Sequence, residues 1–177
     1  MCTPSPLVVA AAFALAIIGN AAFADTPNLG RPATPEELAS WDISIAPDGA
    51  GLPPGGGTPR QGEAVYAAKC LACHGEKGAG KPNDALVGGR GTLAADQAPI
   101  KTVGSFWPYA TTLFDYVRRA MPLNESKSLS NDEVYAVVAY LLLLNGIIGE
   151  TETIDAQALA KVRMPNADGF VPFARGR

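Results

Sequence analysis

The chain has 177 residues, a formal net charge of −3 and a single histidine. This acidic balance argues against nucleic acid as a partner, because phosphate contacts need clustered Lys and Arg side chains. Only three cysteines are present, and two of them lie three positions apart. The chain therefore has no framework of structural disulfides, and the close cysteine pair has to be explained by some other chemistry.

The first 24 residues have the features of a secretory signal peptide. Leu7–Ile18 is an uncharged apolar run that is short for a membrane span. Ala22 and Ala24 place small residues where a signal peptidase reads the chain. We predict cleavage after Ala24 and a periplasmic mature protein without a transmembrane segment. Because no Lys or Arg precedes the apolar run, an uncleaved anchor is the alternative.

Residues 25–60 form an arm rich in proline and glycine. Thr34 can cap a helix that begins with Pro35, and acidic residues follow in the first turn, so we predict a short helix to about Ser40. Apolar residues then alternate with polar ones, as in a half-buried extended segment: Trp41, Ile43 and Ile45. We expect an ordered arm that packs on the core or on a partner.

Residues 61–146 read as a compact helical core. We predict three helices in it. The first is Gln61–Cys70, and the second runs from a Thr112/Asp115 capping pair to Ala120. The third follows a Ser130/Glu133 capping box and ends at Asn145-Gly146. Residues 147–177 form a C-terminal tail with a short helix over Asp155–Ala160. The fold class is therefore all-α.

Cys70, Cys73 and His74 make up a Cys-x-x-Cys-His motif, which is the pattern of covalent haem attachment. Each thiol can form a thioether with one porphyrin vinyl group, and the adjacent imidazole can then reach the iron. A structural zinc site would need a fourth ligand, and a redox disulfide would normally accompany a βαβ pattern. We therefore predict one covalent haem c, with His74 as an axial iron ligand.

The second axial ligand has two candidates in the mature chain, Met121 and Met164, and both precede proline. Met121 is favoured because it lies between the haem motif and the last core helix. The other ring nitrogen of His74 needs an acceptor such as a backbone carbonyl near Pro82, Asp84 or Ala85. The haem propionates need hydrogen-bond donors, and the candidates are Arg90, Trp107 and Tyr109.

The arrangement of Gly62, Tyr66, the haem motif, Met121-Pro122 and a late helix with Tyr140 resembles the class I cytochromes c. The resemblance implies a class I cytochrome c fold around one covalent haem, here with an extended N-terminal arm and a C-terminal tail. In that family the first and last helices cross, and the glycine allows close contact.

A narrower resemblance extends over most of the mature chain. The segments that carry it are Gly30–Thr34, Asp48–Pro53, Phe106–Thr112, Arg118–Pro122 and Met164–Asn166. They resemble cytochrome subunits of bacterial sulfite and sulfane dehydrogenases, which implies Cys70 and Cys73 as haem-attaching residues and His74 and Met121 as axial ligands.

The resemblance also implies a function. We expect an electron-transfer subunit, without bond chemistry of its own, that takes electrons from a molybdopterin-containing sulfite dehydrogenase subunit. It would pass them to a downstream cytochrome c or oxidase. The single haem motif favours the sulfite type, because sulfane-type cytochromes often carry two haems. A sulfane dehydrogenase subunit and a freely diffusing electron carrier are the alternatives.

Overall fold

The computed structural model describes residues 29–94 and 98–171, so the predicted signal peptide lies outside the described residues. By its internal contacts the chain divides into two units, Met1–Trp41 and Asp42–Arg177. The first contains helix α2 (Pro35–Trp41), which matches the helix predicted after Thr34. Among the described residues, no helix has both the length and the apolar character needed to cross a bilayer.

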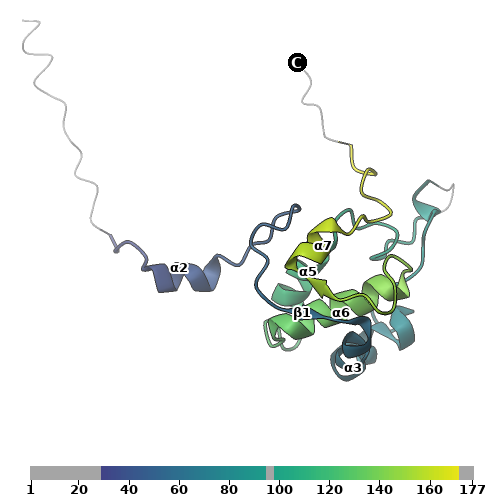
Figure 1. Ribbon diagram of the computed structural model, residues 1–177, viewed down its shortest axis with the longest axis horizontal. Coiled ribbons are helices and arrows are strands. Elements are labelled where there is room, and N and C mark those ends of the chain that lie inside the picture. Colours follow the sequence, from purple (N-terminus) through teal and green to yellow (C-terminus); the bar gives the residue numbers. More distant parts are fainter. Residues whose placement is uncertain (1–28, 95–97, 172–177) are drawn as a thin grey trace, which may run out of the picture. The chain divides into compact units, whose positions relative to one another are not determined.

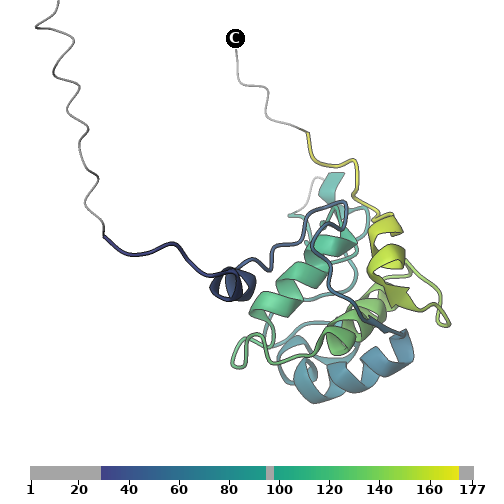
Figure 2. The same ribbon diagram turned by 60° about the vertical axis from the view of Figure 1, so that its left-hand side comes forward.

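The second unit is built from helices, as predicted. Its longest helix, α6 (Asn131–Leu144), lies between α3 (Pro59–Lys69) and α5 (Ala110–Ala120), as Figures 1 and 2 show. The remaining elements are short: α4 (Leu71–His74), the 3-10 turns η1 (Glu76–Gly78) and η2 (Thr92–Ala94), α7 (Ala156–Lys161), and the strands β1 (Gly56–Gly57) and β2 (Ile154–Asp155).

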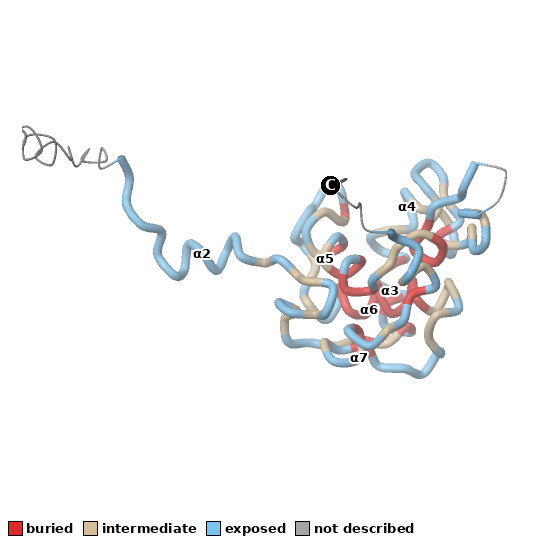
Figure 3. The backbone as a smooth tube through the Cα atoms, turned by 90° about the horizontal axis from the view of Figure 1, so that it is seen from above, coloured by how far each residue is buried: buried red, intermediate tan, exposed pale blue. Residues whose placement is uncertain are grey.

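Helix α6 is the centre of the core. Every residue from Val134 to Leu142 is buried, so the helix needs cover on all its sides (Figure 3). The predicted capping box is confirmed, since the Glu133 N–H donates to Ser130 Oγ at 3.3 Å and the Ser130 N–H donates to Glu133 Oε2 at 2.8 Å. The predicted stop is also confirmed, with Gly146 in the left-handed region at φ 63°.

Two glycines let other backbones approach α6 at a single residue, Ala136. A Cβ at Gly62 in α3 would lie 1.9 Å from the Ala136 carbonyl oxygen, and a Cβ at Gly57 in β1 would lie 2.5 Å from the Ala136 nitrogen. One turn beyond Gly62, the rings of Tyr66 and Tyr140 pack with centroids 5.5 Å apart. This is the glycine-mediated helix contact that the resemblance implied.

The segment from Asp42 to Thr58 is ordered against the core. The buried Tyr135 hydroxyl donates to the Pro53 carbonyl at 2.8 Å, and the Gly56 N–H donates to Asp132 Oδ1 at 2.9 Å. Burial raises the pKa of Tyr135 to about 12, so its hydroxyl keeps the donated proton at neutral pH. These contacts explain why the segment after Trp41 belongs to the second unit.

Two local predictions are wrong. Thr112 does not cap α5, because the helix begins earlier, after Tyr109, and Asp115 pairs with Arg119 instead. The neighbouring Thr111 hydroxyl donates to the Pro47 carbonyl at 3.0 Å, a long-range bond that sequence cannot show. Trp41 is not half-buried in an extended segment, because it is the last residue of α2 and is 82% exposed.

The C-terminal tail, which begins at residue 147, packs against the core. Strand β2 pairs antiparallel with β1, joining Gly57 to Ile154 and Gly56 to Asp155. The Asp155 carboxylate accepts from the Ala158 N–H at 2.8 Å and caps α7, which confirms the predicted C-terminal helix. Beyond α7, the Asn166 amide donates to the Phe106 carbonyl at 2.7 Å, so the tail packs on the core.

Replacing Gly62 with alanine should destabilise the protein, although alanine favours a helix more than glycine does. The added Cβ would meet the Ala136 backbone, and overpacking of this kind costs on the order of 1–3 kcal/mol. We expect a lower midpoint of thermal unfolding, followed by far-UV circular dichroism. Glu63→Ala, at the exposed neighbouring position, is the control. An unchanged midpoint for Gly62→Ala would contradict the close approach.

Candidate functional site

The thiols and the imidazole of the motif share one helical turn. Helix α3 ends at Lys69, and Cys70 breaks it with φ −120° before α4 begins. The Cys73 and His74 N–H groups both donate to the Cys70 carbonyl, at 3.1 and 3.0 Å. Both thiols are free, with Cys70 half-buried and Cys73 exposed. The turn therefore presents two thiols and a following imidazole as one local group.

Burial changes the chemistry of the first thiol. It raises the pKa of Cys70 to about 11, and the neighbouring Cys73 acts in the same direction. At neutral pH the Cys70 side chain is therefore a protonated thiol, whereas direct metal ligation uses the thiolate. Within the described ranges, no three His, Cys, Asp or Glu side chains are grouped to hold a metal ion.

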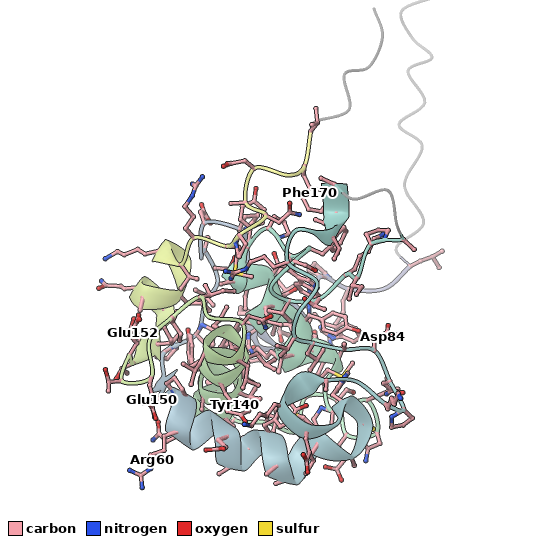
Figure 4. All side chains as sticks on the ribbon, turned by 90° about the vertical axis from the view of Figure 1, so that its right-hand side faces the viewer. Arg60, Asp84, Tyr140, Glu150, Glu152 and Phe170 are labelled. Carbon is pink, nitrogen blue, oxygen red and sulfur yellow. The ribbon has the colours of Figure 1, made fainter. Side chains whose placement is uncertain are left out.

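The His74 ring has a defined orientation. Its Nδ1 lies 3.0 Å from the backbone carbonyl of Asp84, one of the acceptors considered from sequence. Since a carbonyl only accepts, Nδ1 carries a proton, and in the neutral ring the lone pair is then on Nε2. Asp84 lies on the loop beside α4, and Figure 4 labels it. This is the tautomer that an imidazole needs to bind a metal through Nε2.

The loop that carries the Asp84 carbonyl is tied to α4 by backbone hydrogen bonds. The Asn83 N–H donates to the Cys73 carbonyl at 2.9 Å, and the Gly80 N–H donates to the His74 carbonyl at 2.8 Å. From α3, the Tyr66 hydroxyl donates to the Gly75 carbonyl at 2.7 Å. The loop that positions the imidazole is consequently anchored to α4 at the Cys73 and His74 carbonyls.

The two methionines lie in different surroundings. Met164 is 2% exposed and belongs to the hydrophobic core. Met121 follows α5 with an extended backbone, φ −119° and ψ 143°, and its side chain is half-buried at the edge of the core. The residues after Pro122 are exposed up to Ser128. Of the two thioethers, the one at Met121 is therefore at the surface of the core rather than inside it.

The three candidate propionate donors each have another contact. The Arg90 guanidinium donates to the Asn145 carbonyl at 2.8 Å. The Trp107 ring packs edge-on against Tyr116, with centroids 5.6 Å apart, and Tyr109 is exposed and forms an isolated β-bridge with Arg163. Their role toward propionates stays a prediction.

Asn145 has a structural role that sequence reasoning missed. Its amide donates to the Leu86 carbonyl at 3.1 Å and to the Leu141 carbonyl at 2.9 Å, and its Oδ1 accepts from the Gly88 N–H at 3.3 Å. Sequence assigned Asn145 only as a helix stop. Its position after α6 was the available signal, but nothing local shows that the loop around Leu86 lies beside it.

A second missed contact joins the end of α3 to the loop after Met121. Lys69, next to Cys70, forms an ion pair with Glu125 on the loop after Met121, at 2.9 Å. Both side chains are well exposed, so this contact adds little to stability, although it connects the end of α3 to that loop.

Comparison with known proteins identifies the family of this chain. Residues 57–141 match the family described as cytochrome c oxidase, cbb3-type, subunit III. A chain in the crystal structure of the sulfane dehydrogenase SoxCD from Paracoccus pantotrophus matches with a TM-score of 0.80 and 42% identity, covering 85% of this chain and 74% of that chain. The chain belongs to the class I c-type cytochromes. Its cofactor is accordingly haem c.

A curated relative points to the same area of metabolism. The thiosulfate dehydrogenase of Allochromatium vinosum is 33% identical over 82 residues, which is 46% of this cytochrome. The match spans only 29% of that relative's length. The cytochrome is therefore an electron-transfer protein related to enzymes of sulfur oxidation.

The motif fits covalent haem c on the chemistry of its groups. Two free thiols, at Cys70 and Cys73, are the groups that thioether formation with two vinyl carbons requires, and the His74 imidazole that follows them can bind the iron through Nε2. The α3–α6 contact at Gly62 lies two helical turns before Cys70 and fixes where this turn begins.

Replacing Asn145 with alanine should loosen the loop over Leu86–Arg90 without unfolding the helices. The variant removes both the acceptor of the Gly88 N–H and the donor to the Leu86 carbonyl, and losses of this kind cost about 1–3 kcal/mol. Hydrogen exchange followed by mass spectrometry should show faster exchange at Gly88. Asn131→Ala, which loses one bond to the Pro54 carbonyl, is the control. Equal protection in both variants would contradict this role.

Proposed function

We propose that Cys70 and Cys73 hold the haem through thioethers and that His74 and Met121 bind its iron from opposite faces. The support for His74 is the bond from Nδ1 to the Asp84 carbonyl, which leaves Nε2 free to bind. The support for Met121 is its half-buried place beside the core, in contrast to Met164, which is packed within it.

This ligand set gives an electron relay rather than a catalyst. Bound haem c supplies one-electron exchange between ferric and ferrous iron. With a side chain on each face, the protein keeps small molecules such as oxygen or peroxide away from the metal. The thioether of Met121 favours the ferrous state and raises the reduction potential.

The proposed electron donor is a molybdenum-containing sulfite dehydrogenase subunit, with a downstream cytochrome c or oxidase as acceptor. The observation that carries a subunit role is the SoxCD match. It spans about 85% of 177 residues, which is more than the segment from Asp42 to Arg177 can supply. The match therefore reaches into the N-terminal arm, which a cytochrome core does not need for electron exchange.

A sulfane dehydrogenase donor is the second candidate, and it is favoured by the match to SoxCD, which is itself a sulfane dehydrogenase. The single Cys-x-x-Cys-His motif favours the sulfite type. Both donors require the same location, so we propose that residues 1–24 are removed during export and that the mature protein works in the periplasm.

Met121→Ala should lower the reduction potential and open the iron to carbon monoxide. Axial ligands set haem potentials over a range of about 0.8 V, so we expect a decrease on the order of 0.1 V. The measurements are spectroelectrochemical titration of the purified holoprotein and carbon monoxide difference spectra.

Met164→Ala is the matched control for this experiment. Truncating a fully buried methionine should destabilise the fold by about 2–5 kcal/mol, while the ferrous spectrum stays that of a six-coordinate haem. The reverse outcome, with carbon monoxide bound by the Met164 variant and not by the Met121 variant, would exchange the two assignments.

The donor assignment is tested by purifying the full mature chain from its source and analysing the co-purifying protein for molybdenum. Sulfite should then reduce the haem, seen as ferrous absorbance bands, only when that protein is present. A sulfane substrate, added in a parallel sample, distinguishes the second candidate. Absence of a co-purifying molybdenum protein, with sulfite-dependent reduction restored when such a protein is added from a separate preparation, would contradict a subunit role and support a freely diffusing carrier.

A further inference from the structure

Helix α2 is formed by interactions within the arm itself. The Thr34 N–H donates to Glu37 Oε2 at 2.9 Å, and the Glu37 N–H donates to Thr34 Oγ1 at 3.3 Å, which is a reciprocal capping box. Arg31 adds two bonds to the Glu37 carboxylate, at 2.8 and 2.5 Å. A helix of seven residues is marginal in water, so these contacts pre-form a segment that would otherwise be unfolded.

This pre-formed helix presents apolar side chains to solvent. Leu38 and Trp41 are three positions apart, so they lie on the same helix face, and they are 55% and 82% exposed. Leu29, before the helix, is 88% exposed, and no residue of α2 is buried. Exposed apolar clusters on soluble proteins mark interaction sites, and tryptophan is among the commonest hot-spot residues.

We propose that residues 29–41 are a docking segment that binds an apolar groove with a basic rim on the molybdenum-containing subunit. This inference rests on the proposed function. The SoxCD match reaches into the same arm, so the arm is shared with a chain of a sulfur dehydrogenase. A pre-ordered helix also loses less conformational entropy on binding than a flexible leader would.

The acidic side chains of the segment are the reason to propose a basic rim on the partner's groove. Within residues 29–41, Glu37 is paired with Arg31 and Glu36 adds a second carboxylate, and Asp42 follows directly after the segment. The pKa of Glu36 is lowered by its backbone hydrogen bond and by Thr34, which keeps this carboxylate ionised. An acidic arm is repelled by anionic lipid and by a second copy of this chain, whose net charge is −3.

The test compares full-length holoproteins, each titrated with the purified molybdenum subunit by isothermal calorimetry. Trp41→Ala should weaken binding about thirtyfold or more, as expected for loss of an aromatic hot spot. Trp41→Phe should weaken it less, because an aromatic side chain remains. Val171→Ala removes an equally exposed apolar side chain, 89% exposed in the tail, and is the control with unchanged affinity. The haem spectrum and unfolding midpoint should be the same in all variants.

Each other outcome overturns a defined part of the inference. If the native chain does not bind a molybdenum protein, the proposed function itself fails. If the native chain binds and Trp41→Ala binds equally well, the subunit role stands and the docking segment is wrong. If the native chain is a dimer that dissociates in Trp41→Ala, residues 29–41 bind a second copy of this chain. If the native chain binds phosphatidylglycerol vesicles and Trp41→Ala does not, residues 29–41 bind a membrane.

Discussion

The close approach of α3 and β1 to the backbone of Ala136 is the constraint on which the site depends. No side chain larger than hydrogen fits at Gly62 or Gly57, so both segments meet α6 at one fixed residue. From Gly62 the chain is helical up to Lys69, and a rigid helix transmits position with little freedom. The place of Cys70, and of the turn that follows it, is therefore decided by a steric contact two helical turns away.

The loop beside His74 and the loop after Met121 are held by different kinds of contact. On the His74 side, backbone bonds and Asn145 fix the loop that carries the Asp84 carbonyl. On the other side, the loop after Met121 is exposed, and its side-chain link to α3 is the exposed Lys69–Glu125 ion pair. The imidazole therefore has one defined orientation, while a softer loop follows the thioether.

Features coded by neighbouring residues could be predicted, and features formed by distant residues could not. The capping box at Ser130, the helix stop at Asn145 and the cap of α7 each depend on residues at most four positions apart. The pairing of Gly57 with Ile154 and the bond from Thr111 to Pro47 join segments far apart in the chain. Thr112 shows the limit of a weak local signal, because α5 begins at Ala110 and Thr112 lies inside the helix.

The arm illustrates why exposure has to be explained rather than only recorded. Sequence placed Trp41 in a half-buried segment because apolar residues alternate there, and Ile43 and Ile45 do follow that pattern. Trp41 instead ends a helix whose N-terminal cap is satisfied within the arm, so its exposure is not the result of a disordered chain. A freely diffusing carrier gains nothing from a pre-formed helix that shows tryptophan to solvent, and it accepts a risk of aggregation. A subunit with a permanent partner has no such cost, because the same side chain is covered in the complex.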